Sequence, residues 1–174
     1  RIELFQSSSD MVDALVRKQI DGLSGVLPSD VSTVSKIQGV NDFRIGLPAY
    51  VGAFFNLKSP VFADIKARQA FAFSTNRQKI IDDSLKGEAS IAYYPIPAGF
   101  IGFNPQAQKI QFNEQKAKEL YDQTGLGKIN LRIVTLDNPI YKKVALNLAE
   151  NWKKLGLNVE VITAEIGRAS CRER

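Results

Sequence analysis

Carboxylates are the side chains through which this chain could most readily perform catalysis. The sequence of 174 residues contains no His, and its single Cys is Cys171. A Ser-His-Asp triad, a Cys-His pair and a zinc site of thiolates and imidazoles all need residues that are missing here. A carboxylate-dependent hydrolase with an α/β core remains an alternative, and Asp21, Asp64 or Glu88 would then have to approach one another in one pocket.

Charge and glycine spacing argue against several other classes of function. The formal net charge is +5, but Lys and Arg are mixed with Asp and Glu along the chain. No basic run is interleaved with aromatic residues, so we expect no nucleic-acid partner. The segment 99–102 has neither the spacing nor the following Lys-Ser/Thr of a phosphate-binding loop. We expect no cofactor, no resident metal and no membrane span in this chain.

Residues 50–87 have the local chemistry of a strand, a turn and two helices. The run 51–55 is rich in β-favouring residues and ends before Pro60. Asp64 and Asn76 are each placed to cap a helix, and Gly87 is placed to end the second one. Arg68 and Arg77 lie on these two expected helices. We expect both to be solvated surface residues, with ligand contact as the alternative.

The first forty residues favour alternating strands and helices. We expect short strands at 2–5 and 23–27, a helix around 11–16 capped by Ser8 or Ser9, and a second helix around 31–37.

The last third of the chain repeats this alternation more clearly. Asn113 should cap a helix, and 131–136 should form a strand with one apolar face. Asn138, followed by proline, should start a long helix whose apolar positions include Trp152, which we expect in the core. A closing strand is expected at 157–162. The order of elements predicts an α/β fold.

Two segments resemble one known family. The first carries Phe55-Asn56, Pro60, Asp64, Arg68-Gln69-Ala70 and Asn76-Arg77 in that order, and the second is the stretch 152–161. Both are similar to signatures of the peptide/nickel family (family 5) of extracytoplasmic solute-binding proteins, the capture subunits of ABC importers. Asn76 departs from the family, which more often has Asp there, but both residues are good helix caps.

This resemblance implies a periplasmic-binding-protein type II-like fold of two α/β lobes, present here as a fragment. Residues 1–47 would then be a remnant of lobe I that leads to the hinge, and residues 48–164 would be an incomplete lobe II. The segment 165–174 looks like the translation of a sequencing adaptor, so we expect it not to be native. Both ends look truncated, and a signal sequence would be missing.

The resemblance also implies a function and a set of ligand-facing residues. The protein would capture a di- or oligopeptide, or a similar small solute, between its lobes and deliver it to a membrane permease. The segments near the hinge and cleft suggest five ligand-binding residues: Tyr50, Phe54, Asn56, Tyr93 and Tyr94. For the two loop tyrosines, packing of the loop on its own lobe is the alternative. We expect a non-enzymatic, extracytoplasmic monomer, with a solute sensor uncoupled from import as a further alternative.

Overall fold

The computed structural model describes residues 1–45 and 49–165. The chain divides into two compact units, residues 1–47 and 48–174, and each unit has its own cluster of buried apolar side chains. Their assignment to two lobes stays a prediction. The segment expected to be an adaptor translation lies outside the described residues from residue 166 onward.

In residues 1–45, which are the described part of the smaller unit, there are two helices, α1 (Ser8–Val16) and α2 (Val31–Val34). Ser7, rather than Ser8 or Ser9, caps α1, because its hydroxyl accepts a hydrogen bond from the amide of Asp10. The hydroxyl of Ser8 instead donates to the carboxylate of Asp30, which lies just before α2. The two helices enclose a small cluster, whose buried members are Val12, Leu15 and Val34.

The strands expected at 2–5 and 23–27 do not form, and that part of the prediction was wrong. Ile2 and Leu4 are 93% and 96% exposed. Within the described residues, no backbone hydrogen bond joins either segment to a neighbouring strand. A strand is stabilised by pairing with another strand, so β-favouring residues alone do not produce one.

The described residues of the larger unit, 49–165, contain seven elements in chain order. These are α3 (Pro60–Ala63), α4 (Ile65–Ser74), α5 (Arg77–Leu85), α6 (Glu114–Asp122), β1 (Asn130–Leu136), α7 (Pro139–Lys153) and β2 (Asn158–Ala164). The four expected caps are confirmed, because Asp64, Asn76, Asn113 and Asn138 each accept a hydrogen bond of 2.8–3.0 Å from an amide in the first helical turn. Local chemistry therefore determines where these helices begin.

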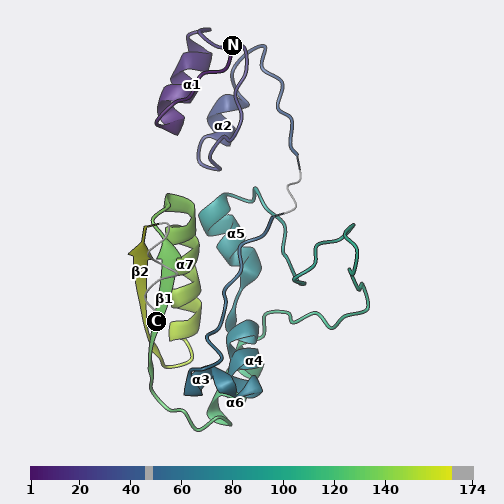
Figure 1. Ribbon diagram of the computed structural model, residues 1–174, viewed down its shortest axis with the longest axis vertical. Coiled ribbons are helices and arrows are strands. Elements are labelled where there is room, and N and C mark those ends of the chain that lie inside the picture. Colours follow the sequence, from purple (N-terminus) through teal and green to yellow (C-terminus); the bar gives the residue numbers. More distant parts are fainter. Residues whose placement is uncertain (46–48, 166–174) are drawn as a thin grey trace. The chain divides into compact units, whose positions relative to one another are not determined.

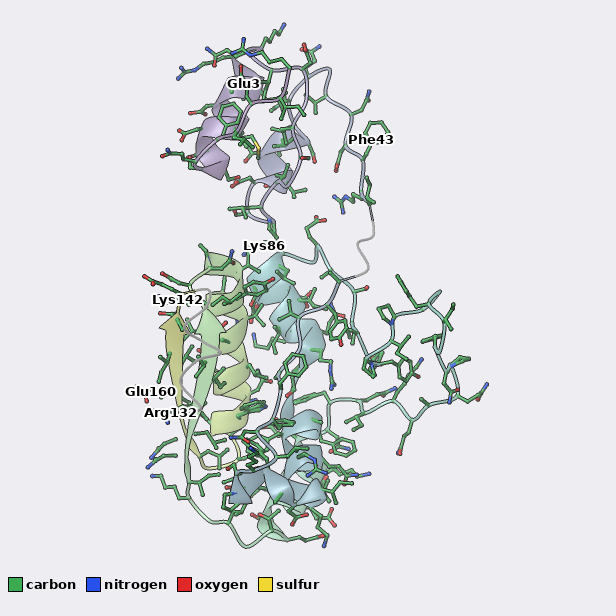
Figure 2. The ribbon with its side chains drawn as sticks, in the orientation of Figure 1. Glu3, Phe43, Lys86, Arg132, Lys142 and Glu160 are labelled. Carbon is green, nitrogen blue, oxygen red and sulfur yellow. The ribbon has the colours of Figure 1, made fainter. Side chains whose placement is uncertain are left out.

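A β-α-β unit closes the described chain. β1 and β2 pair in parallel. Asn130 lies opposite Asn158 at one end and Leu136 lies opposite Ala164 at the other, and α7 is the crossover between the strands. Figure 1 shows α7 along the sheet and α5 beside α7, while α4 packs against α6. Arg132 and Glu160 project from the side of the sheet away from α7 (Figure 2). Among the described residues, no helix has both the length and the apolar character needed to cross a membrane.

An aromatic cluster forms the centre of the larger unit. Phe71 is fully buried, and its ring lies edge-on against Trp152 with the ring centroids 4.9 Å apart. The indole N–H of Trp152 donates to the hydroxyl oxygen of Thr75 at 3.1 Å, so its one polar group is satisfied. Phe55 stacks on Phe62 and lies 5.9 Å from the Trp152 ring. The core position expected for Trp152 is confirmed.

The strand expected at 51–55 is wrong, although its last residue is anchored. No backbone hydrogen bond of the described chain pairs residues 49–55 with another segment. The segment is held through the ring of Phe55, while Val51 and Phe54 remain exposed. It is therefore an extended segment docked by one side chain.

Two phenylalanines from these segments give a matched test of the core. Phe71→Ala should lower the free energy of unfolding by about 3–5 kcal/mol, because it leaves a cavity beside Trp152. Phe54→Ala, at a site that is 90% exposed, should change it by less than about 0.5 kcal/mol. Urea unfolding followed by the fluorescence of Trp152, the only Trp, measures both. Equal losses in the two variants would contradict this description of the core.

Candidate functional site

Three of the five residues expected to face a ligand lie in the extended segment before α3. The side chain of Phe54 is 90% exposed, and that of Tyr50 is about half-exposed. Asn56 is exposed, but its side-chain oxygen already accepts the amide of Lys58 at 3.0 Å, and its carbonyl accepts the amide of Ser59. Asn56 therefore shapes the turn into α3, and within the described residues its side-chain amide nitrogen has no hydrogen-bond partner.

The other two residues lie in the long loop between α5 and α6, which has no regular structure, as its prolines and glycines predict. Tyr94 packs edge-on against Phe103, and its hydroxyl donates to the carbonyl of Ala107 at 3.0 Å. Tyr94 thus holds two parts of the same loop together. Tyr93 is more exposed, and its ring lies 5.5 Å from the ammonium of Lys109.

Tyr93 also lines a shallow hollow at the start of α5, with a volume of about 280 Å³. The hollow brings together the turn before α5, the first turn of that helix and the two ends of the long loop. Its walls are Thr75, Asn76, Arg77, Gln78, Ile91, Tyr93, Gln111 and Phe112. The structure thus places Tyr93, but not the other four expected residues, on the wall of this hollow.

Arg68 and Arg77 have a role that neither sequence interpretation foresaw. Arg68 donates to the carbonyls of Phe62 and Ala63 at 2.7 and 2.9 Å, which satisfies the end of α3. Arg77 donates to the carbonyl of Ile110 at 3.0 Å and so ties the end of the loop to α5. Both side chains are partly buried backbone anchors. No sequence signal identifies such contacts, because the partners are backbone carbonyls.

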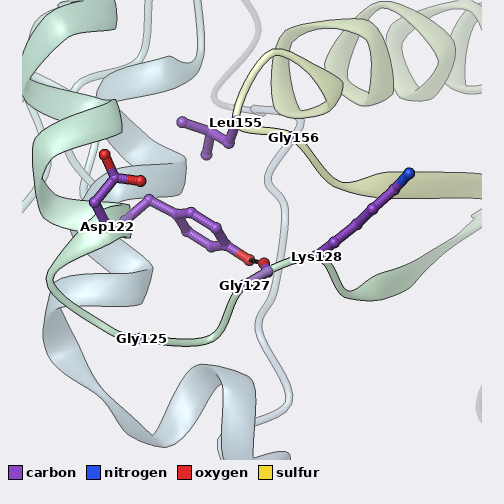
Figure 3. Close-up of a pocket in the computed structure, with 7 residues that line it drawn as sticks. Asp122, Gly125, Gly127, Lys128, Leu155 and Gly156 are labelled. Carbon is purple, nitrogen blue, oxygen red and sulfur yellow. Dashed lines mark hydrogen bonds between the residues drawn. The ribbon is translucent and has the colours of Figure 1, made fainter.

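A second hollow, of about 390 Å³, shares no lining residue with the first, and Figure 3 shows its walls. It is lined by Tyr121, Asp122, Gly125, Gly127, Lys128, Leu155 and Gly156. These residues lie where α6 and α7 end and where β1 and β2 begin. Ligands of open parallel sheets bind outside the carboxyl ends of the strands, so the position of this hollow does not favour a ligand site.

The loop that borders this second hollow is fixed by tight turns and one hydrogen bond. Gly125 and Gly127 have φ values of +65° and +62°, which favour glycine. The hydroxyl of Tyr121 donates to the carbonyl of Gly127 at 2.8 Å, and burial raises the pKa of Tyr121 above its ordinary value.

The acids required by a carboxylate-dependent hydrolase have other surroundings. Asp64 is an exposed helix cap whose carboxylate accepts the amide of Lys66 at 2.8 Å. Neither of the two hollows described above is lined by two carboxylates. In the described parts of the chain, no group of three or more His, Cys, Asp or Glu gathers as a metal ion would require.

Comparison with known sequences yields a consistent set of relatives. The sequence model of the bacterial extracellular solute-binding proteins, family 5 (Middle), matches residues 1–169. The dipeptide-binding protein of Escherichia coli K12 is 26% identical over 151 residues, which cover 80% of this chain and 27% of that protein. The oligopeptide-binding protein AppA of Bacillus subtilis is 27% identical over 155 residues, with coverages of 79% and 28%. The chain thus spans little more than a quarter of these relatives' length.

Solved structures have the same fold over most of the chain. The ABC transporter substrate-binding protein CtaP of Listeria monocytogenes superposes with a TM-score of 0.85 at 22% identity, over 97% of this chain and 35% of that one. DppA of Helicobacter pylori, in complex with the peptide STSA, gives 0.74 at 22% identity, over 94% and 32%. These identities establish the fold alone. The expected fold class, part of a two-lobe periplasmic binding fold, is confirmed.

Tyr121 provides a pH-dependent test of the second hollow. Its raised pKa means that the unfolded chain loses the phenolic proton first, at about pH 10. Stability from this group is complete below that pH and is lost as the pH rises through the folded pKa. Tyr121→Phe should lower the free energy of unfolding by about 1 kcal/mol at pH 7, because the hydrogen bond to Gly127 is lost. Between about pH 9 and 11, the free energy of unfolding of this variant should fall less steeply with pH than that of the unmodified chain. Urea unfolding across this range measures both effects, and parallel curves would contradict the assignment.

Proposed function

Because the chain belongs to the bacterial extracellular solute-binding proteins of family 5, we propose that it forms part of the substrate-binding subunit of an ABC importer. In this function the protein captures a di- or oligopeptide, or a similar small solute, and delivers it to a membrane permease. The observation that carries the proposal is the match of the family over residues 1–169.

The names of the relatives favour peptide as the ligand. The E. coli and B. subtilis proteins are named for dipeptide and oligopeptide binding, and the H. pylori structure holds a peptide. NikZ of Campylobacter jejuni, which superposes with a TM-score of 0.72, was solved with Ni(L-His) instead. The fold is therefore compatible with more than one solute, and the chemistry of the cleft residues decides between them.

Capture needs no covalent chemistry, which suits a chain without His. A solute that touches two lobes has a higher affinity for their closed arrangement, and it shifts the population toward that arrangement. The larger unit would supply part of one side of the cleft. Sequence outside the present 174 residues would complete this lobe and supply most of the other one. Tyr50, Phe54 and Tyr93 expose aromatic surface suited to a peptide, and Asn56 offers its amide nitrogen. Tyr94 would support the loop that presents Tyr93.

The proposal also includes the protein's surroundings. It acts outside the cytoplasmic membrane, in the periplasm or as a surface lipoprotein, and presents its closed form to the permease. It works as a monomer, without enzymatic activity and without a nucleic-acid partner.

Calorimetric titration tests the proposal on two proteins, the complete product of the gene and the present chain of 174 residues. The gene product should bind Ala-Ala-Ala with a Kd of about 1 μM or lower. The present chain should bind at least about 100-fold more weakly, because it contributes one side of the cleft. Sucrose and a nickel–histidine chelate serve as competing solutes of other classes.

Failure of the gene product to bind any peptide would refute peptide capture. Submicromolar binding by the present chain alone would refute the two-sided cleft. Uptake of labelled Ala-Ala-Ala by cells with and without the gene separates import from solute sensing, because only an importer's loss abolishes uptake.

A further inference from the structure

Arg77 is a partly buried cation that forms no ion pair within the part of the chain that the structure describes. Among the described residues, its guanidinium has one hydrogen-bond partner, the carbonyl of Ile110, and no carboxylate close enough for an ion pair. Partial burial lowers the pKa of Arg77 from its ordinary value, and the electrostatic interaction with Tyr93 opposes that shift. Removing a charge from water is costly unless it is paired, so this position would gain from an anion.

The hollow beside Arg77 offers further hydrogen-bond donors. Within the described structure, the hydroxyl of Tyr93 and the side-chain amide of Gln111 have no hydrogen-bond partner, and both groups line the hollow. Lys109 adds a second positive charge near Tyr93, with its ammonium 5.5 Å from the ring centroid. The donors come from the first turn of α5 and from both ends of the long loop.

Several other polar groups on the walls of the hollow already have hydrogen-bond partners. The hydroxyl of Thr75 donates to the carbonyl of Phe71 at 2.7 Å, and the side-chain oxygen of Asn76 accepts the amide of Lys79. The amide of Gln78 donates to Asp82 at 2.9 Å. We therefore assign the attraction for an anion to the guanidinium of Arg77 and to the two side-chain donors, Tyr93 and Gln111.

We propose that this hollow is a carboxylate-binding subsite, in which Arg77 supplies the positive charge and Tyr93 and Gln111 donate hydrogen bonds. Charge-assisted bonds from a planar guanidinium to a carboxylate are among the strongest in proteins, and Arg can keep its bond to Ile110 while other N–H groups face the hollow. The identification of the bound carboxylate with the free carboxyl group of a captured peptide rests on the proposed function.

The subsite is tested first with sodium acetate as the probe on the 174-residue chain. In ¹⁵N NMR spectra, the Nε–H signal of Arg77 and the side-chain amide signals of Gln111 should shift saturably. The expected Kd is about 10 mM, the weak affinity of a single small group. Sodium chloride at the same ionic strength is the control, and it should not produce these shifts.

Variants distinguish the subsite from general charge effects. The double variant Tyr93→Phe with Gln111→Ala removes two donors from exposed side chains and should weaken acetate binding about tenfold with the backbone spectrum otherwise unchanged. Arg68→Lys is the matched control, because Arg68 is also a partly buried backbone anchor but does not line the hollow, and it should bind acetate as the unmodified chain does. Absence of saturable shifts, or identical affinity in the double variant, would overturn the subsite.

A second measurement links the subsite to the captured solute. The complete gene product should bind Ala-Ala-Ala at least about tenfold more tightly than the same peptide with an amidated carboxyl terminus, and the double variant should lose most of that preference. If peptide binds with no such preference, the subsite is wrong while the proposed function stands. If acetate binds the hollow but the gene product binds no peptide, the subsite stands and its link to a peptide fails.

Discussion

The contact between Phe71 and Trp152 is the interaction on which the larger unit depends. Phe71 lies on α4, Trp152 lies on α7, and their rings meet with the centroids 4.9 Å apart. Neighbouring elements contact one or the other of these two rings. Tyr121 of α6 packs against Phe71, and Phe55 of the extended segment packs against Trp152, whose indole N–H donates to Thr75. A second link fixes α5, because the buried side chain of Asn151 accepts the backbone amide of Asn76 at 3.0 Å. The contacts that hold the helices together therefore also fix the position of the hollow at the start of α5.

The sequence predicted the larger unit well where the determinants are local. Asp64, Asn76, Asn113 and Asn138 cap the helices that they were expected to cap, because a cap depends on a residue and the amides two or three positions further on. The strands β1 and β2 were also expected, and they form because α7 brings each to the other. The strands expected at 2–5, 23–27 and 51–55 fail for the opposite reason. Their residues favour strands, but no partner strand lies beside them in the described chain.

The surroundings of the proposed ligand-facing residues were less predictable, because they depend on contacts between distant parts of the chain. Arg77 anchors Ile110, and Tyr94 anchors Ala107, across a loop whose course no sequence pattern determines. The two expected tyrosines of this loop have different surroundings. Tyr94 binds another part of the loop, whereas Tyr93 lines a hollow. Residue type indicated that these side chains could bind something. Only the folded backbone distinguishes a side chain that binds the protein itself from one that is left for a ligand.

We propose that the segment 50–56 and the ends of the long loop face the solute, while the core around Trp152 only supports them. Hydrogen exchange of the complete gene product, measured with and without a saturating tripeptide, distinguishes backbone that faces the solute from backbone in the core. Peptide should slow exchange at residues 50–56, 91–93 and 110–112 and should leave exchange in α4 and α7 unchanged. Slower exchange confined to the turn at 124–128, on the side of the second hollow, would contradict this proposal.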